Sequence, residues 1–121
     1  MLRVVLIEDE VLILMALAIV MADWGYDTVA AYSEDDAVAK LAGGPAPELL
    51  ITDWRLREGL TGGQAIARIR AMYQKGIPAI VMTGETDPER LREIGRLGCP
   101  VLHKPVQTAE LRAVMNAVVA A

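Results

Sequence analysis

The residues of this sequence that could do chemistry follow four of its short apolar runs. They are Glu8 and Asp9 after the first run, Asp53 after the third, Thr83 after the fourth and Lys104 after the last. Together they supply three carboxylates, one hydroxyl and one ammonium group. Ligands of parallel α/β sheets bind outside the carboxyl ends of the strands, so polar residues at such ends are the first candidates for a site.

Three carboxylates at one edge of a sheet need positive charge beside them. Two like charges about 4 Å apart repel each other by on the order of 4 kcal/mol at an effective dielectric constant near 20. A divalent cation and Lys104 would remove this repulsion, and oxygen ligands suit Mg²⁺. The residues therefore predict a Mg²⁺ site that a phosphoryl group completes. The carboxylate of Asp53 would attack phosphorus, and Thr83 and Lys104 would donate hydrogen bonds to the phosphoryl oxygens.

Alternating short and long patterns along the chain predict the elements that position these residues. Strands are expected at 2–7, 27–31, 49–52, 79–82 and 101–102, and helices near 10–24, 34–42, 63–74, 88–97 and 109–120. Strands that alternate with helices are typical of a doubly wound parallel sheet with helices on both faces. The carboxyl ends of all five strands then lie at one edge, which brings the polar residues together.

Composition limits the class of protein. The 121 residues fit one domain, and 54% of them are hydrophobic, which excludes disorder. A net charge of −4 and a pI near 4.9 argue against a nucleic-acid-binding surface. The single cysteine, Cys99, excludes an internal disulfide and fits a reducing compartment. The apolar run 11–22 is shorter than the roughly 20 residues that span a bilayer, so we expect a cytoplasmic protein without a membrane segment.

Over essentially its whole length the chain resembles the receiver domain of response regulators in bacterial two-component signalling systems. The resemblance rests on four features in the right order: an acid pair after the first strand, Asp53 after the third, Thr83 after the fourth and Lys104-Pro105 after the fifth. It implies the flavodoxin-like fold with strand order 2-1-3-4-5 and a single receiver domain over 1–121 without an output domain. It also implies a cis peptide bond before Pro105.

The resemblance also implies roles for individual residues. Asp53 would be the phosphoacceptor, and Asp9 and Asp53 would bind Mg²⁺ directly. Glu8 would act through water, and the backbone carbonyl of Arg55 would be a further ligand. The phosphoryl group would come from a histidine kinase or a phosphotransfer domain. The domain would be a regulator with slow self-dephosphorylation rather than an enzyme, and it would signal to an unknown downstream protein by contact.

Two positions depart from the family pattern. Receivers usually have a proline four residues after the phosphoacceptor, and this chain has Arg57. Many receivers have an aromatic residue three positions before the lysine, and this chain has Val101. We therefore expect phosphorylation to change the surface of the fourth helix, fifth strand and fifth helix, the switch face, in a weaker or different way than in those receivers. By strand alternation His103 points to the same face as Val101, as a partner contact, a pH-sensitive switch or an ordinary half-exposed strand residue.

Arg55 and Glu85 each lie two residues after a predicted site residue, Asp53 and Thr83. We hypothesise that they form an ion pair across the mouth of the site and shield the phosphoryl group from water. The alternative is two solvated charges that contribute little to stability.

The helix predicted near 10–24 is apolar on all sides, which is unusual for a helix that covers a sheet. We expect its inward face to be Leu12, Ala16, Val20 and Trp24, and its partly exposed residues to be Leu14, Met15, Ala18 and Ile19. An exposed apolar patch marks a partner site. The resemblance implies that Leu14, Met15 and Ile19 contact the phosphohistidine-bearing helical domain. Alternatives are the seam of a weak homodimer, with the protein otherwise monomeric, and deeper packing of the helix.

Three other functions were considered. A receiver-like adaptor that works without phosphorylation would explain the absence of the aromatic residue, but it would not need Asp9, Asp53, Thr83 and Lys104. A flavin- or nucleotide-binding domain would need a glycine-rich loop after the first strand, where this chain has acids. A metal-dependent aspartate phosphatase would need a second acid at the position of Arg55.

Overall fold

The five apolar runs form one parallel sheet in the computed structural model, which describes residues 1–120. The strands are β1 (Arg3–Ile7), β2 (Asp27–Ala31), β3 (Leu49–Asp53), β4 (Ala79–Thr83) and β5 (Val101–His103). Their order is β2-β1-β3-β4-β5, which confirms the predicted topology. Every residue of β3 and β4 is buried, as expected for strands that helices cover on both sides.

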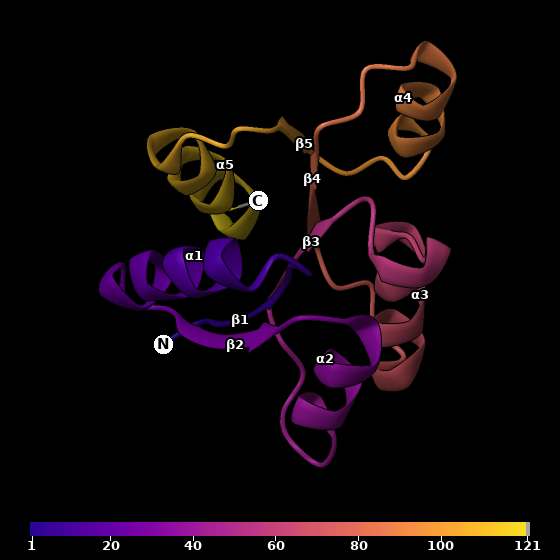
Figure 1. Ribbon diagram of the computed structural model, residues 1–121. Helices are drawn as coiled ribbons and strands as arrows, with labels where there is room; N and C mark the ends of the chain where they lie inside the picture. The colour runs from indigo at the N-terminus through magenta and orange to yellow at the C-terminus, as the bar shows by residue number, and fades with distance from the viewer. Residues whose placement is uncertain (121) are drawn as a thin grey trace.

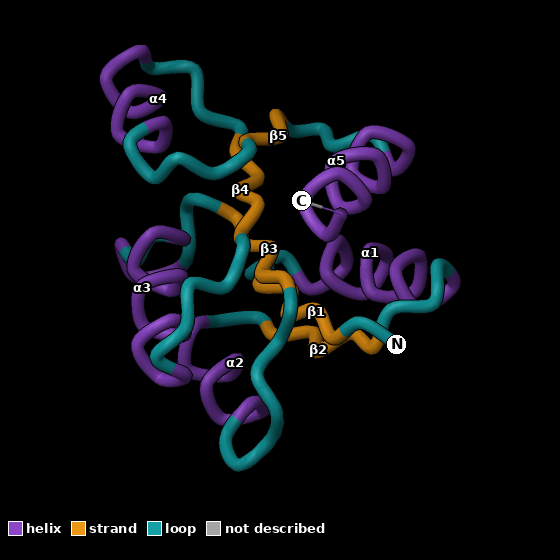
Figure 2. The backbone as a smooth tube through the Cα atoms, turned by 180° about the vertical axis from the view of Figure 1, so that it is seen from behind, coloured by secondary structure: helices purple, strands orange, loops and turns teal. Residues whose placement is uncertain are grey.

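Helices connect the strands and cover the sheet on both faces. They are α1 (Val11–Asp23), α2 (Glu34–Leu41), α3 (Gly62–Tyr73), α4 (Pro88–Gly95) and α5 (Thr108–Ala120), and a short 3-10 helix, η1 (Arg57–Gly59), precedes α3. One face of the sheet carries α1 and α5, and the other carries α2, α3 and α4 (Figure 1). The view from behind shows the same two layers of helices with the strands between them (Figure 2).

Side chains on successive strand residues alternate between two cores. Along β1, Val4 and Leu6 pack with α1 and α5, whereas Val5 and Ile7 pack toward α2 and α3. The period of two along each strand produces this division, because successive side chains point to opposite faces. Both cores end at the carboxyl edge of the sheet, where the polar residues begin.

Side-chain caps fix where several helices begin. Ser33 accepts a hydrogen bond from the amide of Asp36, and Asp87 accepts one from the amide of Glu89 directly before α4, as their positions in the sequence predict. A full capping box at Thr61 starts α3 one residue before the predicted bound. No helix among residues 1–120 is long and apolar enough to cross a membrane.

The orientation of α1 differs from the prediction. Leu14 is only 7% exposed and packs inward with Leu17 and Met21, whereas Leu12, predicted to be buried, is 82% exposed. Buried positions three and four residues apart form one stripe along the helix. The prediction was wrong because α1 has no polar face that would indicate its rotation, so the sequence alone left several stripes equivalent.

Met15 and Ile19 lie on the exposed side of α1, as predicted, with exposed fractions of 56% and 69%. The apolar surface on α1 is therefore real, and its members are Val11, Leu12, Met15 and Ile19 rather than the set that included Leu14.

Candidate functional site

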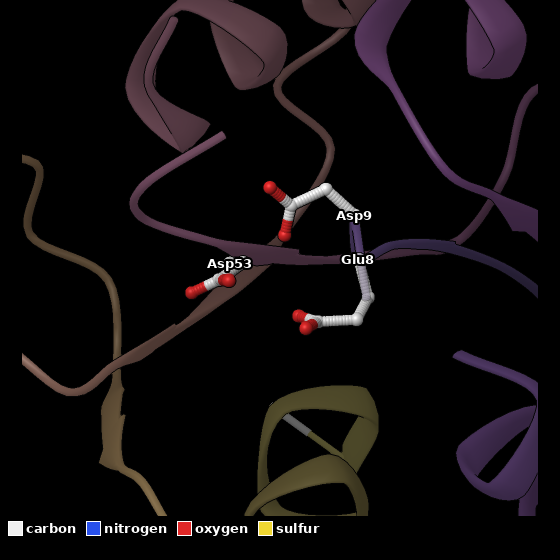
Figure 3. Close-up of side chains that lie close together, drawn as sticks. All are labelled: Glu8, Asp9 and Asp53. Carbon is white, nitrogen blue, oxygen red and sulfur yellow. The ribbon is translucent and has the colours of Figure 1, made fainter. Parts of the chain in front are cut away.

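The acid pair of β1 and the acid of β3 meet because the two strands are neighbours in register. Ile7 lies opposite Thr52, so the residues that follow, Glu8 and Asp53, also lie beside each other. One carboxylate oxygen from each of Glu8, Asp9 and Asp53 lies within 4.8 Å of the others. Figure 3 shows the carboxylates of Glu8 and Asp9 on either side of the end of β1, each next to Asp53. The parallel pairing of β1 with β3 and the chain that directly follows β1 bring these three carboxylates together.

Lys104 supplies the positive charge of this cluster. Its Nζ lies 2.9 Å from Oδ2 of Asp53 and 3.2 Å from both carboxylate oxygens of Glu8. The Lys104 amide donates to the carbonyl of Thr83 at 2.8 Å, which fixes the residue at the end of the sheet. Burial alone would lower the pKa of Lys104, but the hydrogen bond and charge of Asp53, and then those of Glu8, outweigh it and raise the pKa. Lys104 therefore stays protonated between the two acids.

Glu8 is fully buried, with none of its surface exposed. Burial, and next the negative charge of Asp53, raise the pKa of Glu8 from 4.5 to about 7, and Lys104 opposes this rise. One ammonium group therefore does not neutralise the three carboxylates. The site favours a further cation.

A cavity of about 480 Å³ opens at this edge of the sheet. Its lining includes Asp9, Asp53, Thr83 and Lys104. Thr83 is 2% exposed, and its Oγ1 accepts a hydrogen bond from the amide of Glu85 at 3.0 Å. Because Oγ1 is the acceptor in this contact, its own hydrogen remains available to an anion in the cavity.

Gly62 fixes the backbone of Asp53 from the side of α3, a role that the sequence analysis missed. Its amide donates to the carbonyl of Trp54 at 2.7 Å. A Cβ at this position would lie 2.4 Å from the carbonyl oxygen of Asp53 and 2.9 Å from Cγ2 of Thr52. Only glycine therefore allows α3 to begin so close to the end of β3. The Gly62-Gly63 pair at the start of α3 was the available signal.

Two arginines from the loop after β3 reach across the site to different neighbours. Nη2 of Arg55 lies 2.9 Å from Oε2 of Glu85, which confirms the predicted ion pair. Nη2 of Arg57 donates to the backbone carbonyl of Asp9 at 3.2 Å. This contact was not predicted from the sequence, in which Arg57 stands out only as a departure from the family pattern.

The remaining predicted residues lie near β5. The peptide bond between Lys104 and Pro105 is cis, as predicted. Val101 is half-buried and packs against the core between the sheet and the helices α2, α3 and α4. His103 is exposed. Their roles as a switch or partner face stay predictions.

Comparison with known proteins shows which family has this arrangement. The profile of the family "Response regulator receiver domain" matches residues 4–116. The chain belongs to the response regulator receiver domain family. Receiver domains of two-component systems typically bind Mg²⁺ at an acidic pocket, and this chain has an acidic cluster of Glu8, Asp9 and Asp53.

Individual relatives agree with the family. The chain is 31% identical over 118 residues to the phosphate regulon transcriptional regulatory protein PhoB of Escherichia coli K12, an alignment that covers 96% of this chain and 51% of PhoB. The chain thus spans about half the length of the curated relatives it matches. A response regulator receiver protein from Pseudomonas putida is 29% identical, with a TM-score of 0.83 and 96% of both chains covered. The chemotaxis protein CheY4 of Vibrio cholerae is 25% identical, with a TM-score of 0.84 and 98% of both chains covered.

Proposed function

We propose that this receiver domain accepts a phosphoryl group on Asp53 from a histidine kinase or a phosphotransfer domain. One observation carries the proposal: Lys104 bridges Asp53 and the buried Glu8 at the edge of a cavity that Thr83 also lines. Receiver domains interact with such donors, and this family membership supports the choice of partner. The phosphoryl group is later lost by slow hydrolysis, and a downstream protein reads the phosphorylated state by contact.

Each side chain has a defined part in the transfer. A carboxylate oxygen of Asp53 forms the new bond to phosphorus as the bond from phosphorus to the donor histidine breaks. Lys104 holds the Asp53 carboxylate by a hydrogen bond and then offers a charge-assisted hydrogen bond to the phosphoryl oxygens. The Thr83 hydroxyl donates its free hydrogen to the same group. Gly62 keeps the Asp53 backbone in place.

The donor set fits Mg²⁺. Three carboxylates offer hard oxygen ligands within 4.8 Å of one another, and the cluster has more negative than positive charge. We propose that Asp9 and Asp53 bind the ion directly, that Glu8 acts through water and that the backbone carbonyl of Arg55 is a further ligand. When bound, Mg²⁺ supplies the positive charge that the transferring phosphoryl oxygens require.

The exposed face of α1 is the proposed docking site of the helical phosphodonor domain. Leu12, Met15 and Ile19 are 82%, 56% and 69% exposed. On a different flank of α1, an apolar groove of about 470 Å³ is lined by Ile13, Leu17, Met82, Pro105 and Val106, and also by Lys104. Because Lys104 lines both this groove and the cavity of the acids, a helix in the groove would place its histidine near Asp53.

Trp54 allows a direct test of the phosphoacceptor site, since it follows Asp53 in the chain and is 5% exposed. Tryptophan emission is followed while Mg²⁺ and then beryllofluoride, a stable phosphoryl mimic, are added to the wild type and to Asp53→Ala. We expect a saturable, Mg²⁺-dependent change that the variant lacks. Trp24, at the far end of α1, gives a constant background. A wild type with no response and no beryllofluoride adduct by mass would contradict the proposal.

The docking face has its own test with a matched control. Ile19→Glu should abolish phosphorylation by a histidine kinase that phosphorylates the wild type, and leave phosphorylation by acetyl phosphate unchanged. Leu14→Glu, on the buried side, should lose both together with the folded state. If Ile19→Glu kept full transfer from the kinase, α1 would not be the docking site.

A receiver-like adaptor that acts without phosphorylation is the second candidate. The observation in its favour is Val101, a half-buried aliphatic residue at the position where many receivers have an aromatic switch residue. The adaptor would bind its partner equally well with and without beryllofluoride.

A further inference from the structure

Glu85 connects the phosphoacceptor cavity to the beginning of α4. Its amide donates to Oγ1 of Thr83 at 3.0 Å, and its Oε2 pairs with Arg55 at 2.9 Å. Its other carboxylate oxygen accepts a hydrogen bond from the amide of Asp87 at 3.3 Å. Asp87 in turn caps α4 by accepting from the amide of Glu89 at 3.1 Å. A continuous chain of polar contacts therefore runs from Thr83 and Arg55 to the first turn of α4.

The two members of the ion pair differ in their freedom to move. The side chain of Arg55 is 72% exposed, whereas that of Glu85 is 13% exposed. Arg55 can therefore reorient through water, and Glu85 is held by its surroundings. Arg55 also lines the cavity that contains Asp53. Its guanidinium group is therefore close to two sites of negative charge, the Glu85 carboxylate and the cavity that contains Asp53.

We propose that Arg55 exchanges partners on phosphorylation, leaving Glu85 for the phosphoryl group, and that this exchange loosens the first turn of α4. This inference rests on the proposed function, because it requires a phosphoryl group on Asp53. Such a group carries about two negative charges and three acceptor oxygens, against one charge on Glu85. Arginine forms its strongest contacts with groups of this kind. The added charge therefore draws Arg55 away from Glu85.

When Arg55 leaves the ion pair, the Glu85 side chain changes its position. A largely buried carboxylate without its cation is costly, so Glu85 turns toward water. It then withdraws the acceptor that holds the amide of Asp87, the residue that caps α4. At the same time the Thr83 hydroxyl turns toward the phosphoryl group and strains its contact with the Glu85 amide. Both changes affect the segment 84–87, which connects β4 to α4.

The helix at the end of this path is easily moved. It has eight residues, and only Ile94 among them is buried. Val101 on the neighbouring β5 is a small half-buried side chain. The relay through Arg55 and Glu85 thus gives this chain a route from Asp53 to α4 that does not need an aromatic residue in β5.

Hydrogen–deuterium exchange of the peptide 85–95, read by mass spectrometry, tests the relay. In the wild type, Mg²⁺ with beryllofluoride should raise exchange of the first-turn amides of α4 about two- to fivefold, the change in an opening equilibrium that loss of one exposed ion pair gives. Arg55→Ala should show the raised exchange before any addition and little further change after it. Glu85→Ala, which removes the acceptor of the Asp87 amide itself, should behave in the same way.

Arg68→Ala is the matched control. Arg68 pairs with Glu34 at 2.8 Å, and Glu34 is 12% exposed, much like Glu85. This pair holds the beginning of α2 and lies outside the relay, so its loss should leave the exchange of 85–95 and its response unchanged.

The intact mass of every variant shows whether the beryllofluoride adduct has formed. This measurement separates a failure of the relay from a failure of the proposed function. If Arg55→Ala formed the adduct and α4 responded as in the wild type, the relay would be overturned and the proposed function would stand. The same holds if the wild type formed the adduct without a change in α4. A wild type that formed no adduct would overturn the proposed function itself.

Discussion

Glu8 should make the stability of the domain fall as the pH rises toward 8, in the absence of divalent cations. Its pKa in the folded protein is about 7 and its ordinary value is 4.5, because burial and the charge of Asp53 disfavour the ionised form. Between these two values the native state binds more protons than the unfolded chain. The free energy of unfolding therefore falls with rising pH in this window.

The size of the effect follows from the pKa difference. At about 1.4 kcal/mol for each pKa unit, the rise from 4.5 to about 7 corresponds to about 3 kcal/mol. Most of this should be lost between about pH 5 and pH 8. The proposed Mg²⁺ ion would bind the native site and not the unfolded chain, so at pH 8 a tenfold excess over its Kd should add about 1.4 kcal/mol of stability.

Urea unfolding in EDTA, followed by tryptophan emission at several pH values, measures this effect. Glu8→Gln is the reference, because glutamine does not titrate and has nearly the same shape. Acids that do not contact Glu8 contribute equally to both proteins, so the difference between the two curves reports Glu8 together with its neighbours Asp53 and Lys104. If the wild type and Glu8→Gln kept a constant difference from about pH 5 to pH 8, the assignment of Glu8 as a strained buried acid would be refuted.

Three further substitutions, one of them with a matched control, test the surroundings of the site. Gly62→Ala should cost about 3 kcal/mol of stability by urea unfolding, because the added methyl group meets backbone that has no room to yield. The control is Gly76→Ala, where nothing lies within 4 Å of the added Cβ, and it should change stability by less than about 1 kcal/mol. Thr61→Ala removes the capping box of α3 and should cost about 1 kcal/mol in the same assay, whereas an unchanged value would mean that the cap contributes nothing. Lys104→Met leaves two acids without their cation and should cost roughly 3 kcal/mol in EDTA, part of which Mg²⁺ recovers; a cost that Mg²⁺ does not reduce would contradict this.

The fold was predictable because each strand is a short apolar run and each helix a longer pattern. The strand ends were less certain: Asp53, Thr83 and His103 belong to β3, β4 and β5 rather than to the loops after them. Polar residues at the end of a buried strand give no composition signal that separates strand from loop. The convergence of Glu8 and Asp53 was nevertheless predictable, because parallel strands align their carboxyl ends whatever the register of a single residue.

The errors and omissions have particular physical causes. The rotation of α1, which buries Leu14 and exposes Leu12, was not predictable because every side of this helix is apolar. The need for glycine at Gly62 depends on how closely α3 approaches β3, which only coordinates reveal. The contact of Arg57 with the carbonyl of Asp9 joins two loops whose conformations the sequence did not fix. The pair of Arg55 and Glu85 was predictable because both residues follow strand ends by the same number of positions.

Phosphorylation by acetyl phosphate shows directly whether Asp53 is the phosphoacceptor. The wild type and Asp53→Asn are incubated with the donor, with Mg²⁺ or with EDTA, and their intact masses and peptides are compared. We expect a gain of one phosphoryl group on the peptide that contains Asp53, only with Mg²⁺ and only in the wild type. A phosphoryl group on another residue, equal labelling in EDTA, or an unmodified wild type would contradict it.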